Sequence, residues 1–445
     1  MLAIVKHPSR RRLSELGFSL ADVTYVFSRM IGQRGLLDEL LVAATSARAV
    51  AARLDEADDG AVSMFADQPD DAVETTVRES MTHAWLFTGP PGSGRSVAAT
   101  CFAAALQCQS PDVVGCGECR ACTTVLAGTH GDVRHIVPEG LTISVKQIRD
   151  IVQLSARRPT TGRWQIVVVE DADRLTEQGA NALLKAVEEP PERTIFLLCA
   201  PSVAPEDIAI TLRSRCRHAG LTAPAAADIA RVLVDRDGIE PDRAEWAASV
   251  SGGHVGRAKR LAIDEASRDQ RDQALGLARA ATRDSTAFAA AEKLVKTATD
   301  VAAAISAERD AVETEELMTA LGAGGTGKGT ARPPRGTAGA VKELEKRQKS
   351  RRTRTMRDVL DRALVDLAAL FRDGLTLAMG AQVTLMHPDK AGDLTGPMSR
   401  HASPAQLLRC IEAVLDCRDA LEKNVKPKFA VDAMVVRIGR ELSRR

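Results

Sequence analysis

At 445 residues the chain is too long for one compact core, so several domains are expected. Its 60 basic and 59 acidic residues leave a formal charge of +1, which excludes recognition of nucleic acid by the charge of the chain as a whole. Only 3% of the residues are aromatic, too few for a protein that binds single strands by stacking bases on aromatic platforms. The sequence has no run of about 18 consecutive apolar residues that would span a membrane, and we expect a soluble cytoplasmic protein.

Residues 1–24 carry no regular pattern and are expected to form a leader, to which we assign no function. A helical run of leucines and alanines follows Ile31-Gly32-Gln33, and residues 55–80 are acidic and interrupted by proline and glycine, as in a solvated loop. Beyond them, apolar strands are predicted at 83–88, 164–169 and 194–199, and helices at 97–106, 143–154 and 179–189. Unbroken apolar strands that alternate with helices are typical of a parallel sheet covered on both faces, so residues 25–221 are expected to form an α/β domain.

The remainder of the chain is predicted to be helical. From 222 to 310 the pattern indicates short helices, interrupted at Gly252-Gly253-His254. Residues 311–357 are predicted to form a flexible, basic linker, because 322–340 are of low complexity and lysine and arginine crowd the residues that follow. Apolar residues at a spacing of three to four return in 358–445, and they predict an all-helical domain there.

The segment Gly89-Pro90-Pro91-Gly92-Ser93-Gly94-Arg95-Ser96 has the pattern of a phosphate-binding loop between a strand and a helix. In such a loop, backbone N–H groups surround phosphate oxygens, a lysine reaches the outer phosphates, and a serine or threonine binds Mg2+. Arg95 stands where the lysine is expected, and its planar fork is not equivalent to an ammonium group at a tight site. The alternative is a glycine-rich turn with no ligand, and the sequence leaves nucleotide binding open.

The strand predicted at 164–169 is followed by acidic residues. In P-loop ATPases an acid at this place holds Mg2+, and in many of them the next residue is a glutamate that polarises the attacking water. Asp171 fits the first role, but Ala172 occupies the place of the glutamate, and Glu170 is expected to point to the opposite side of the strand. Because Arg95 and Ala172 alter two separate catalytic parts, we expect the ATPase activity of the chain alone to be absent or very weak.

A cluster of cysteines lies between the loop and the acidic strand, with the pattern C-x7-C-x2-C-x2-C: Cys108, Cys116, Cys119 and Cys122. Four thiolates at this spacing close a tetrahedral zinc site and leave no open position, as in a structural site. The other cysteines are scattered on apolar stretches, as expected in a reducing compartment. The sequence predicts structural Zn2+ here, with an iron–sulfur cluster or free buried thiols as the alternatives.

One longer block points to a known family. Asn181-Ala182-Leu183-Leu184-Lys185-Ala186-Val187-Glu188-Glu189-Pro190-Pro191, followed by Thr211-Leu212-Arg213-Ser214-Arg215-Cys216, resembles bacterial clamp-loader AAA+ subunits. Ile31-Gly32-Gln33 is similar to their N-terminal signature, and the cysteine cluster to their zinc module. The resemblance covers residues 26 to about 260, whereas the helical C-terminal region is similar to their collar domain only in kind. Within this family, the altered phosphate loop and the missing glutamate resemble the delta-prime branch of the DNA polymerase III subunits.

The resemblance implies a RecA-like AAA+ core with a zinc module over 108–122, a small helical lid over 222–310 and a helical collar over 358–445. It also implies a non-motor member of a hetero-pentameric ring with gamma/tau motor and delta subunits. Such a ring opens a sliding clamp and loads it on primed DNA without sequence preference.

The resemblance further implies roles for single residues. Arg215 becomes an arginine finger for a neighbouring ATPase subunit, with a solvated helix end as the alternative. Arg257 falls in the sensor-2 region, and Gly89–Ser96 with Asp171 line the chain's own ATP/Mg2+ site. Candidates for contact with the DNA backbone, which solvated helix faces explain equally well, are Lys146, Arg149 and Arg157.

Two other functions compete with this interpretation. The first is an active clamp-loader motor of the gamma/tau type, against which Arg95 and Ala172 argue. The second is a zinc-dependent nucleic-acid-binding module that uses the AAA+ core as a scaffold, and it predicts salt-sensitive DNA binding that chelation abolishes. The balanced charge and the few aromatic residues make the second the weaker competitor.

Overall fold

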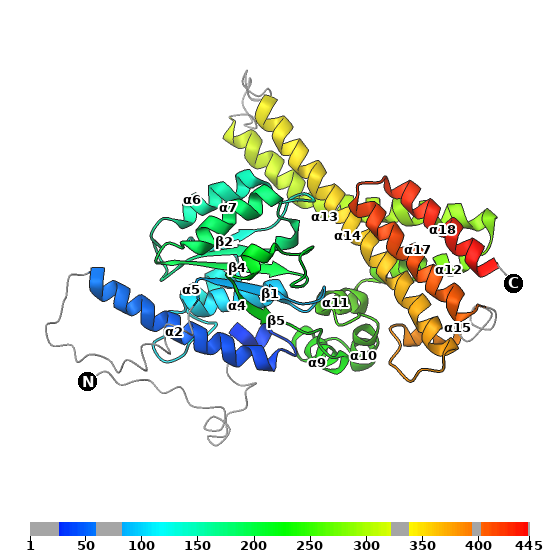
Figure 1. Ribbon diagram of the computed structural model, residues 1–445, viewed down its shortest axis with the longest axis horizontal. Helices are drawn as coiled ribbons and strands as arrows, with labels where there is room; N and C mark the ends of the chain where they lie inside the picture. The colour runs from blue at the N-terminus through cyan, green and yellow to red at the C-terminus, as the bar shows by residue number, and fades with distance from the viewer. Residues whose placement is uncertain (1–25, 59–81, 322–337, 394–401, 444–445) are drawn as a thin grey trace. The chain divides into compact units, whose positions relative to one another are not determined.

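The computed structural model describes residues 26–58, 82–321, 338–393 and 402–443, so the leader expected at 1–24 lies outside the described residues. The chain divides into two compact units (Figure 1). The first comprises Met1–Pro138, Thr142–Ile229 and Gly253–Val255, and the second Glu139–Leu141, Ala230–Gly252 and Gly256–Arg445. None of the described helices combines the length and the apolar character that crossing a membrane requires.

The first unit is built around a parallel five-stranded sheet with the strand order β2-β3-β4-β1-β5. Its strands are β1 (Ala84–Thr88), β2 (Val133–Ile136), β3 (Gln165–Val169), β4 (Thr194–Ala200) and β5 (Arg217–Gly220). Every residue of the three central strands β3, β4 and β1 is buried, whereas the two edge strands are buried in part. Central strands that are buried on both faces confirm the predicted parallel α/β fold.

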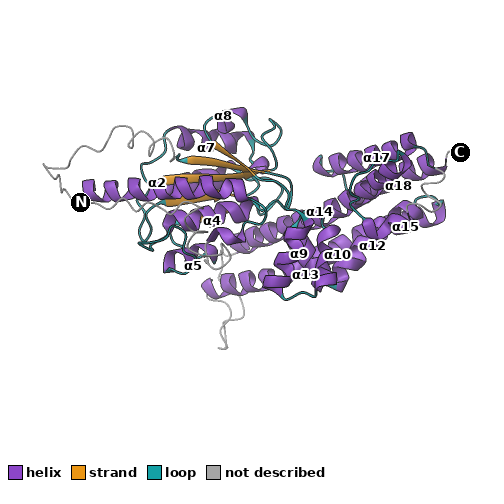
Figure 2. Ribbon diagram, turned by 90° about the horizontal axis from the view of Figure 1, so that it is seen from below, coloured by secondary structure: helices purple, strands orange, loops and turns teal. Residues whose placement is uncertain are grey.

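Helices cover both faces of the sheet, as Figure 2 shows with the strands in orange. Successive side chains of β3 point to opposite faces: Ile166 and Val168 pack with α2, α4 and α5, and Val167 and Val169 pack with α6, α7 and α8. The bounds are α2 (Arg34–Asp58), α4 (Arg95–Gln107), α5 (Arg120–Leu126), α6 (Val145–Ser155), α7 (Glu177–Glu188) and α8 (Ile210–Arg213). Two short 3-10 helices complete the unit, η1 (Val26–Arg29) and η2 (Ala172–Arg174).

Local signals set where these helices begin and end. The Ser144 hydroxyl accepts a hydrogen bond from the Gln147 N–H, and the Gln147 side chain accepts one from the Ser144 N–H, so α6 begins at Val145 rather than at 143. Helix α2 continues to Asp58, so the loop predicted from residue 55 is wrong for 55–58. An ion pair of 2.7 Å between the Arg193 guanidinium and Asp55 holds this last turn of the helix.

The second unit is helical, as predicted. It contains most of α9 (Ala226–Asp237), followed by α10 (Pro241–Ser249), α11 (Val255–Ile263), α12 (Glu265–Ala280), α13 (Asp284–Ala320), α14 (Ala338–Ala378), η3 (Pro388–Lys390), α15 (Ala391–Asp393), α17 (Pro404–Glu422) and α18 (Pro427–Ser443). Its main core joins α12, α13, α14, α17 and α18. The interruption predicted at Gly252-Gly253-His254 is confirmed, because these residues separate α10 from α11.

The flexible linker predicted over 311–357 is wrong for the residues that the structure describes. Residues 311–320 continue α13, and 338–357 form the first half of α14. The basic residues of α14 have acidic partners on α13: the Arg351 guanidinium lies 2.5 Å from an Asp310 carboxylate oxygen and 2.6 Å from a Glu313 oxygen. The basic residues that suggested a linker therefore form ion pairs between two long helices, α13 and α14. Residues 322–337 lie outside the described residues.

Candidate nucleotide and metal sites

The loop between β1 and α4 has the backbone that phosphate binding requires. Gly92 and Gly94 adopt left-handed conformations with φ of 88° and 91°, and Gly94 is the N-cap of α4. At Gly92 a Cβ atom would lie 2.5 Å from the Cβ of His254, so only glycine fits there. In this loop, glycines in left-handed conformations come directly before the N-terminus of a helix. This is the arrangement in which successive backbone N–H groups bind anions.

Arg95 is tied to the loop itself. Its Nη1 donates a hydrogen bond of 2.9 Å to the carbonyl of Gly89, the first residue of the loop. Ser93 is buried, and its hydroxyl makes no hydrogen bond to another described residue. The side-chain amide of Gln33 donates to the Thr222 carbonyl at 2.7 Å and to the Ser93 carbonyl at 3.4 Å. The Ile31-Gly32-Gln33 signature therefore connects the loop to the chain that follows β5.

Glu170 was expected to point to the opposite side of the strand from Asp171, and it was not counted among the candidate site residues. Its N–H bonds the Ile136 carbonyl and so continues the β3 ladder, which places its side chain on the face of Ile166 and Val168. That face is covered by α4, the helix into which the phosphate loop leads. On the same face, a Glu170 oxygen lies 3.5 Å from Nδ1 of His135 in β2. Strand periodicity gave the alternation correctly, but only the fold shows which face α4 covers.

Asp171 leaves the strand, with a left-handed φ of 50°, and Ala172 is buried against α6 and α7. Burial, and after it the negative charge of Asp171, raises the pKa of Asp173. The positive charge of Arg95 acts on the same carboxyl group in the opposite direction, so the strand end and the loop are electrostatic neighbours. Both lie at the carboxyl edge of the sheet, where open α/β sheets bind their ligands.

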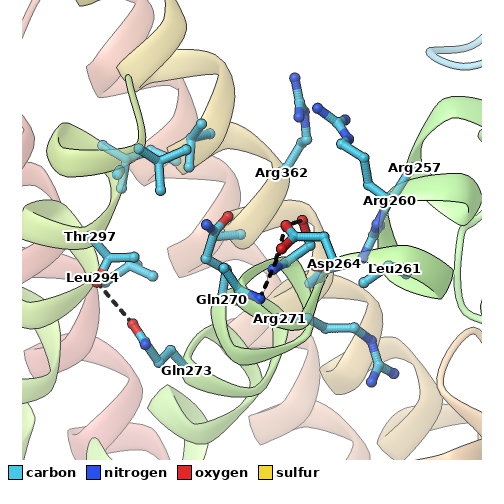
Figure 3. Close-up of a pocket in the computed structure, with 18 of the residues that line it drawn as sticks. Arg257, Arg260, Leu261, Asp264, Gln270, Arg271, Gln273, Leu294, Thr297 and Arg362 are labelled. Carbon is cyan, nitrogen blue, oxygen red and sulfur yellow. Dashed lines mark hydrogen bonds and ion pairs between the residues drawn. The ribbon is translucent and has the colours of Figure 1, made fainter. Parts of the chain in front are cut away.

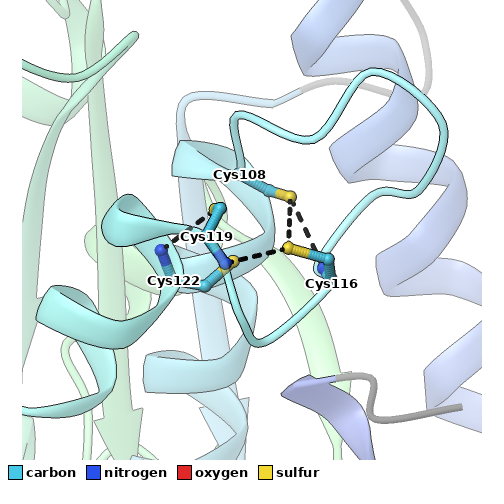
Figure 4. Close-up of side chains that lie close together, drawn as sticks. All are labelled: Cys108, Cys116, Cys119 and Cys122. Carbon is cyan, nitrogen blue, oxygen red and sulfur yellow. Dashed lines mark hydrogen bonds between the residues drawn. The ribbon is translucent and has the colours of Figure 1, made fainter.

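The four predicted cysteines converge at the junction of α4 and α5 (Figure 4). Cys108 is the C-cap of α4, Cys119 is the N-cap of α5, and Cys122 lies within α5. All four sulfur atoms lie within 4.8 Å of one another. The sulfur atoms of Cys108 and Cys116 are 3.7 Å apart. Four sulfurs bound tetrahedrally to zinc at about 2.3 Å are about 3.8 Å apart, so the residues fit the predicted ion.

Backbone N–H groups point at these sulfur atoms, as thiolate ligands require. Cys116 N donates to the Cys108 sulfur at 3.4 Å, and Cys119 N donates to the Cys116 sulfur at 3.3 Å. The hydrogen bond with the Cys122 thiol lowers the pKa of Cys108 to about 4. A Zn2+ ion bound here by Cys108, Cys116, Cys119 and Cys122 would supply a structural cross-link, because a four-thiolate set leaves no position for substrate.

Arg215 follows α8 and is exposed on the surface of the first unit, with 41% of its side chain accessible. Its Nη2 lies 2.6 Å from a carboxylate oxygen of Glu188, the last residue of α7. Its Nη1 donates to the Thr211 carbonyl at 3.0 Å. The guanidinium is therefore held in one direction while it stays accessible to another molecule.

Comparison with known proteins places this geometry in a family. The family model described as "DNA polymerase III, delta subunit" matches residues 70–225. The DNA polymerase III subunit delta' of Pseudomonas aeruginosa is 38% identical over 204 residues, covering 44% of this chain and 60% of that protein. Residues 70–225 belong to the delta-prime clamp-loader family. It spans less than two thirds of that relative's length.

Other relatives agree with the delta-prime assignment or lie close to it. The subunit delta' of Escherichia coli is 39% identical over 145 residues, or 32% of this chain and 43% of that protein. The subunit tau of Bacillus subtilis is 35% identical over 143 residues, or 32% of this chain and 25% of that protein. A solved gamma subunit-related protein of Thermotoga maritima is 14% identical with a TM-score of 0.37, and covers 84% of this chain and 99% of that one, a likeness too distant to bear on function.

The range matched by the family model, residues 70–225, holds the phosphate loop, the cysteine cluster, the acidic strand end and Arg215. Arg257 falls outside it, on α11 in the second unit, where its Nη2 lies 2.5 Å from a carboxylate oxygen of Asp366. Its sensor-2 role stays a prediction. The basic residues considered for DNA contact are exposed on α6 or just after it: Lys146, Arg149 and Arg157.

Proposed function

We propose that the chain is the non-motor, delta-prime subunit of a clamp loader and that Arg215 completes the ATP site of a neighbouring motor subunit. The observation that carries the proposal is the accessible guanidinium of Arg215, directed by Glu188. A guanidinium that is fixed before the partner arrives loses little freedom when it meets the charge of a transferring phosphoryl group. The delta-prime family assignment supports the same role.

The chain's own nucleotide site supports a weak or absent ATPase. Arg95 donates to the carbonyl of its own loop, and a buried alanine occupies position 172. ATP and Mg2+ at this site would meet the N–H groups of Gly94, Arg95 and Ser96 in the loop Gly89–Ser96, and the acids Glu170 and Asp171. One observation favours the alternative of an active motor: Glu170 faces the side of the sheet that α4 covers, so an acidic pair is present in the order Glu–Asp. ATP hydrolysis by the purified chain alone would establish that alternative.

The partners belong to the proposal as well. We infer a hetero-pentamer with gamma/tau motor and delta subunits that acts on a sliding clamp and on primed DNA. DNA contact in such a complex is through the backbone and independent of sequence, which agrees with a chain whose overall charge is +1. The proposed structural Zn2+ at the cysteine cluster supports the fold of this subunit and takes no part in hydrolysis.

The test is the ATPase rate of a reconstituted complex that contains Arg215→Ala. We expect assembly to be unchanged and the rate to fall by about 10³-fold or more at the affected site, the range measured for arginine fingers. Arg213→Ala is the matched control, because Arg213 is an exposed neighbour that donates to the Val203 carbonyl. An assembled complex that keeps its ATPase rate with Arg215→Ala would refute the finger role.

A further inference from the structure

The second unit holds a cavity of about 460 Å³ (Figure 3), and of its lining residues only Arg257 has a role predicted above. Helices α11, α12, α13 and α14 form its walls. Much of the lining is aliphatic, with Leu294 and Val301 from α13 and Leu360 from α14 among the residues that face it. Its volume lies in the range of about 300–1,000 Å³ that is usual for ligand pockets.

Arginines gather at one end of this cavity, away from Leu294, as Figure 3 shows for Arg257, Arg260 and Arg362. The charge of Arg257 is balanced by Asp366, at 2.5 Å. Among the described residues, no hydrogen bond or ion pair is made by the side chain of Arg260 or of Arg362. Two arginines from α11 and α14 therefore line the cavity without an ion pair of their own. The Asp264 carboxylate also lines the cavity, but it is engaged as the N-cap of α12, where it accepts from the N–H groups of Ala266 and Ser267.

The acids nearest to Arg362 along α14 are engaged elsewhere. Asp358 lies 3.7 Å from Nε of Arg354, and Asp361 lies 2.6 Å from Nε of Arg418. Partial loss of hydration, and after it the positive charges of Arg260 and Arg257, lowers the pKa of Arg362, whereas Asp358 and Asp361 act in the opposite direction. Arg260 and Arg362 are both exposed, so a partner can reach them. An anion placed between the arginines would relieve a repulsion that the free protein carries.

We propose that this cavity docks an acidic peptide segment of a partner protein, with a bulky apolar side chain among the aliphatic residues and carboxylates against Arg260 and Arg362. Guanidinium groups pair with carboxylates through two parallel hydrogen bonds, which fixes the direction of the segment. Inorganic phosphate would leave the aliphatic wall in contact with water. A nucleic-acid base would find no aromatic side chain among the residues that line the cavity.

Fluorescence polarisation of the full chain with labelled peptides tests the proposal. The probe is a pool of acidic peptides, each with one leucine or phenylalanine between aspartates and glutamates, and a matched pool carries asparagine and glutamine instead. We expect micromolar binding of the acidic pool and at least tenfold weaker binding after Arg260→Glu or Arg362→Glu. Ala304→Trp, at an exposed alanine of the α13 wall, should fill the cavity and abolish binding.

Lys346→Glu is the matched control, because Lys346 is an exposed cation of α14 that does not line the cavity; it should bind as the unaltered chain does. Circular dichroism confirms that each variant is folded. The proposal is overturned if the acidic pool does not bind at millimolar peptide, if both pools bind alike, or if Ala304→Trp binds normally. Competition by decanoate but not by unlabelled acidic peptide would overturn it too, because it would assign the cavity to a small amphiphile.

Discussion

Replacement of Asp132 by asparagine should destabilise the first unit by several kcal/mol. This buried carboxylate precedes β2, and each of its oxygens accepts three hydrogen bonds from the loop before β3 or from its first residue. Oδ1 accepts from Thr160 N, Thr160 Oγ1 and Gln165 Nε2 at 2.9, 2.8 and 3.1 Å. Oδ2 accepts from Thr161 N, Thr161 Oγ1 and Gly162 N at 2.7, 2.8 and 2.7 Å.

The magnitude follows from what an amide can accept. The threonine hydroxyls can rotate and accept from the new NH2 group, but in either orientation of the amide two N–H donors lose their acceptor. Each buried donor left unpaired costs about 1–3 kcal/mol, so Asp132→Asn should lower the free energy of unfolding by about 2–6 kcal/mol. Urea unfolding followed by tryptophan fluorescence measures it, because Trp164 lies one residue from the Asp132 partner Gln165. A loss below about 1 kcal/mol would refute the reasoning.

Asp150→Asn is the control, because Asp150 is exposed on α6, and its effect should stay within about 0.5 kcal/mol. The same carboxylate predicts a pH dependence. Burial opposes ionisation of Asp132, but the N–H groups of Thr160, Thr161 and Gly162 outweigh it and hold its pKa well below the usual value. Its contribution is therefore complete above the unfolded pKa of about 3.9 and is lost as pH falls through the folded pKa. The difference between the two proteins should shrink below about pH 4.

Two further predictions concern the metal and the helix pair. Chelation of the metal, or the variant Cys122→Ser, should lower the melting temperature and expose thiols to a thiol reagent. The control variant Cys417→Ser should leave the metal content unchanged. Equal metal content in the two variants would contradict the zinc site. Hydrogen bonding from Arg351 lowers the pKa of Glu313 to about 2. A double-mutant cycle of these two residues should therefore show a coupling energy of about 1 kcal/mol above about pH 4.5, and this coupling should be lost as the pH falls toward 2. A coupling independent of pH over that range would count against the pair.

The sequence predicted the sheet and the cysteine cluster because both follow from local patterns. Buried parallel strands have apolar runs, and four cysteines within a short segment have few arrangements other than a shared ion. The linker prediction failed because composition cannot show that Arg351 pairs with Asp310, which lies 41 positions earlier in the chain. Glu170 was left out of the candidate site for a related reason: alternation along β3 gives two faces, and only the tertiary fold identifies the one beneath α4.

Helix α4 connects the two sites of the first unit. It begins at Arg95, whose side chain is bonded within the phosphate loop, and its C-cap is Cys108, whose sulfur belongs to the cysteine cluster. Alanines and Phe102 bury the middle of the helix against the sheet, so neither end moves independently of it. The 13 residues span about 20 Å, so the phosphate loop and the cysteine cluster lie at opposite ends of one packed helix. A thiolate-bound ion at Cys108 would therefore anchor the C-terminal end of the same helix whose N-terminal end follows the phosphate loop.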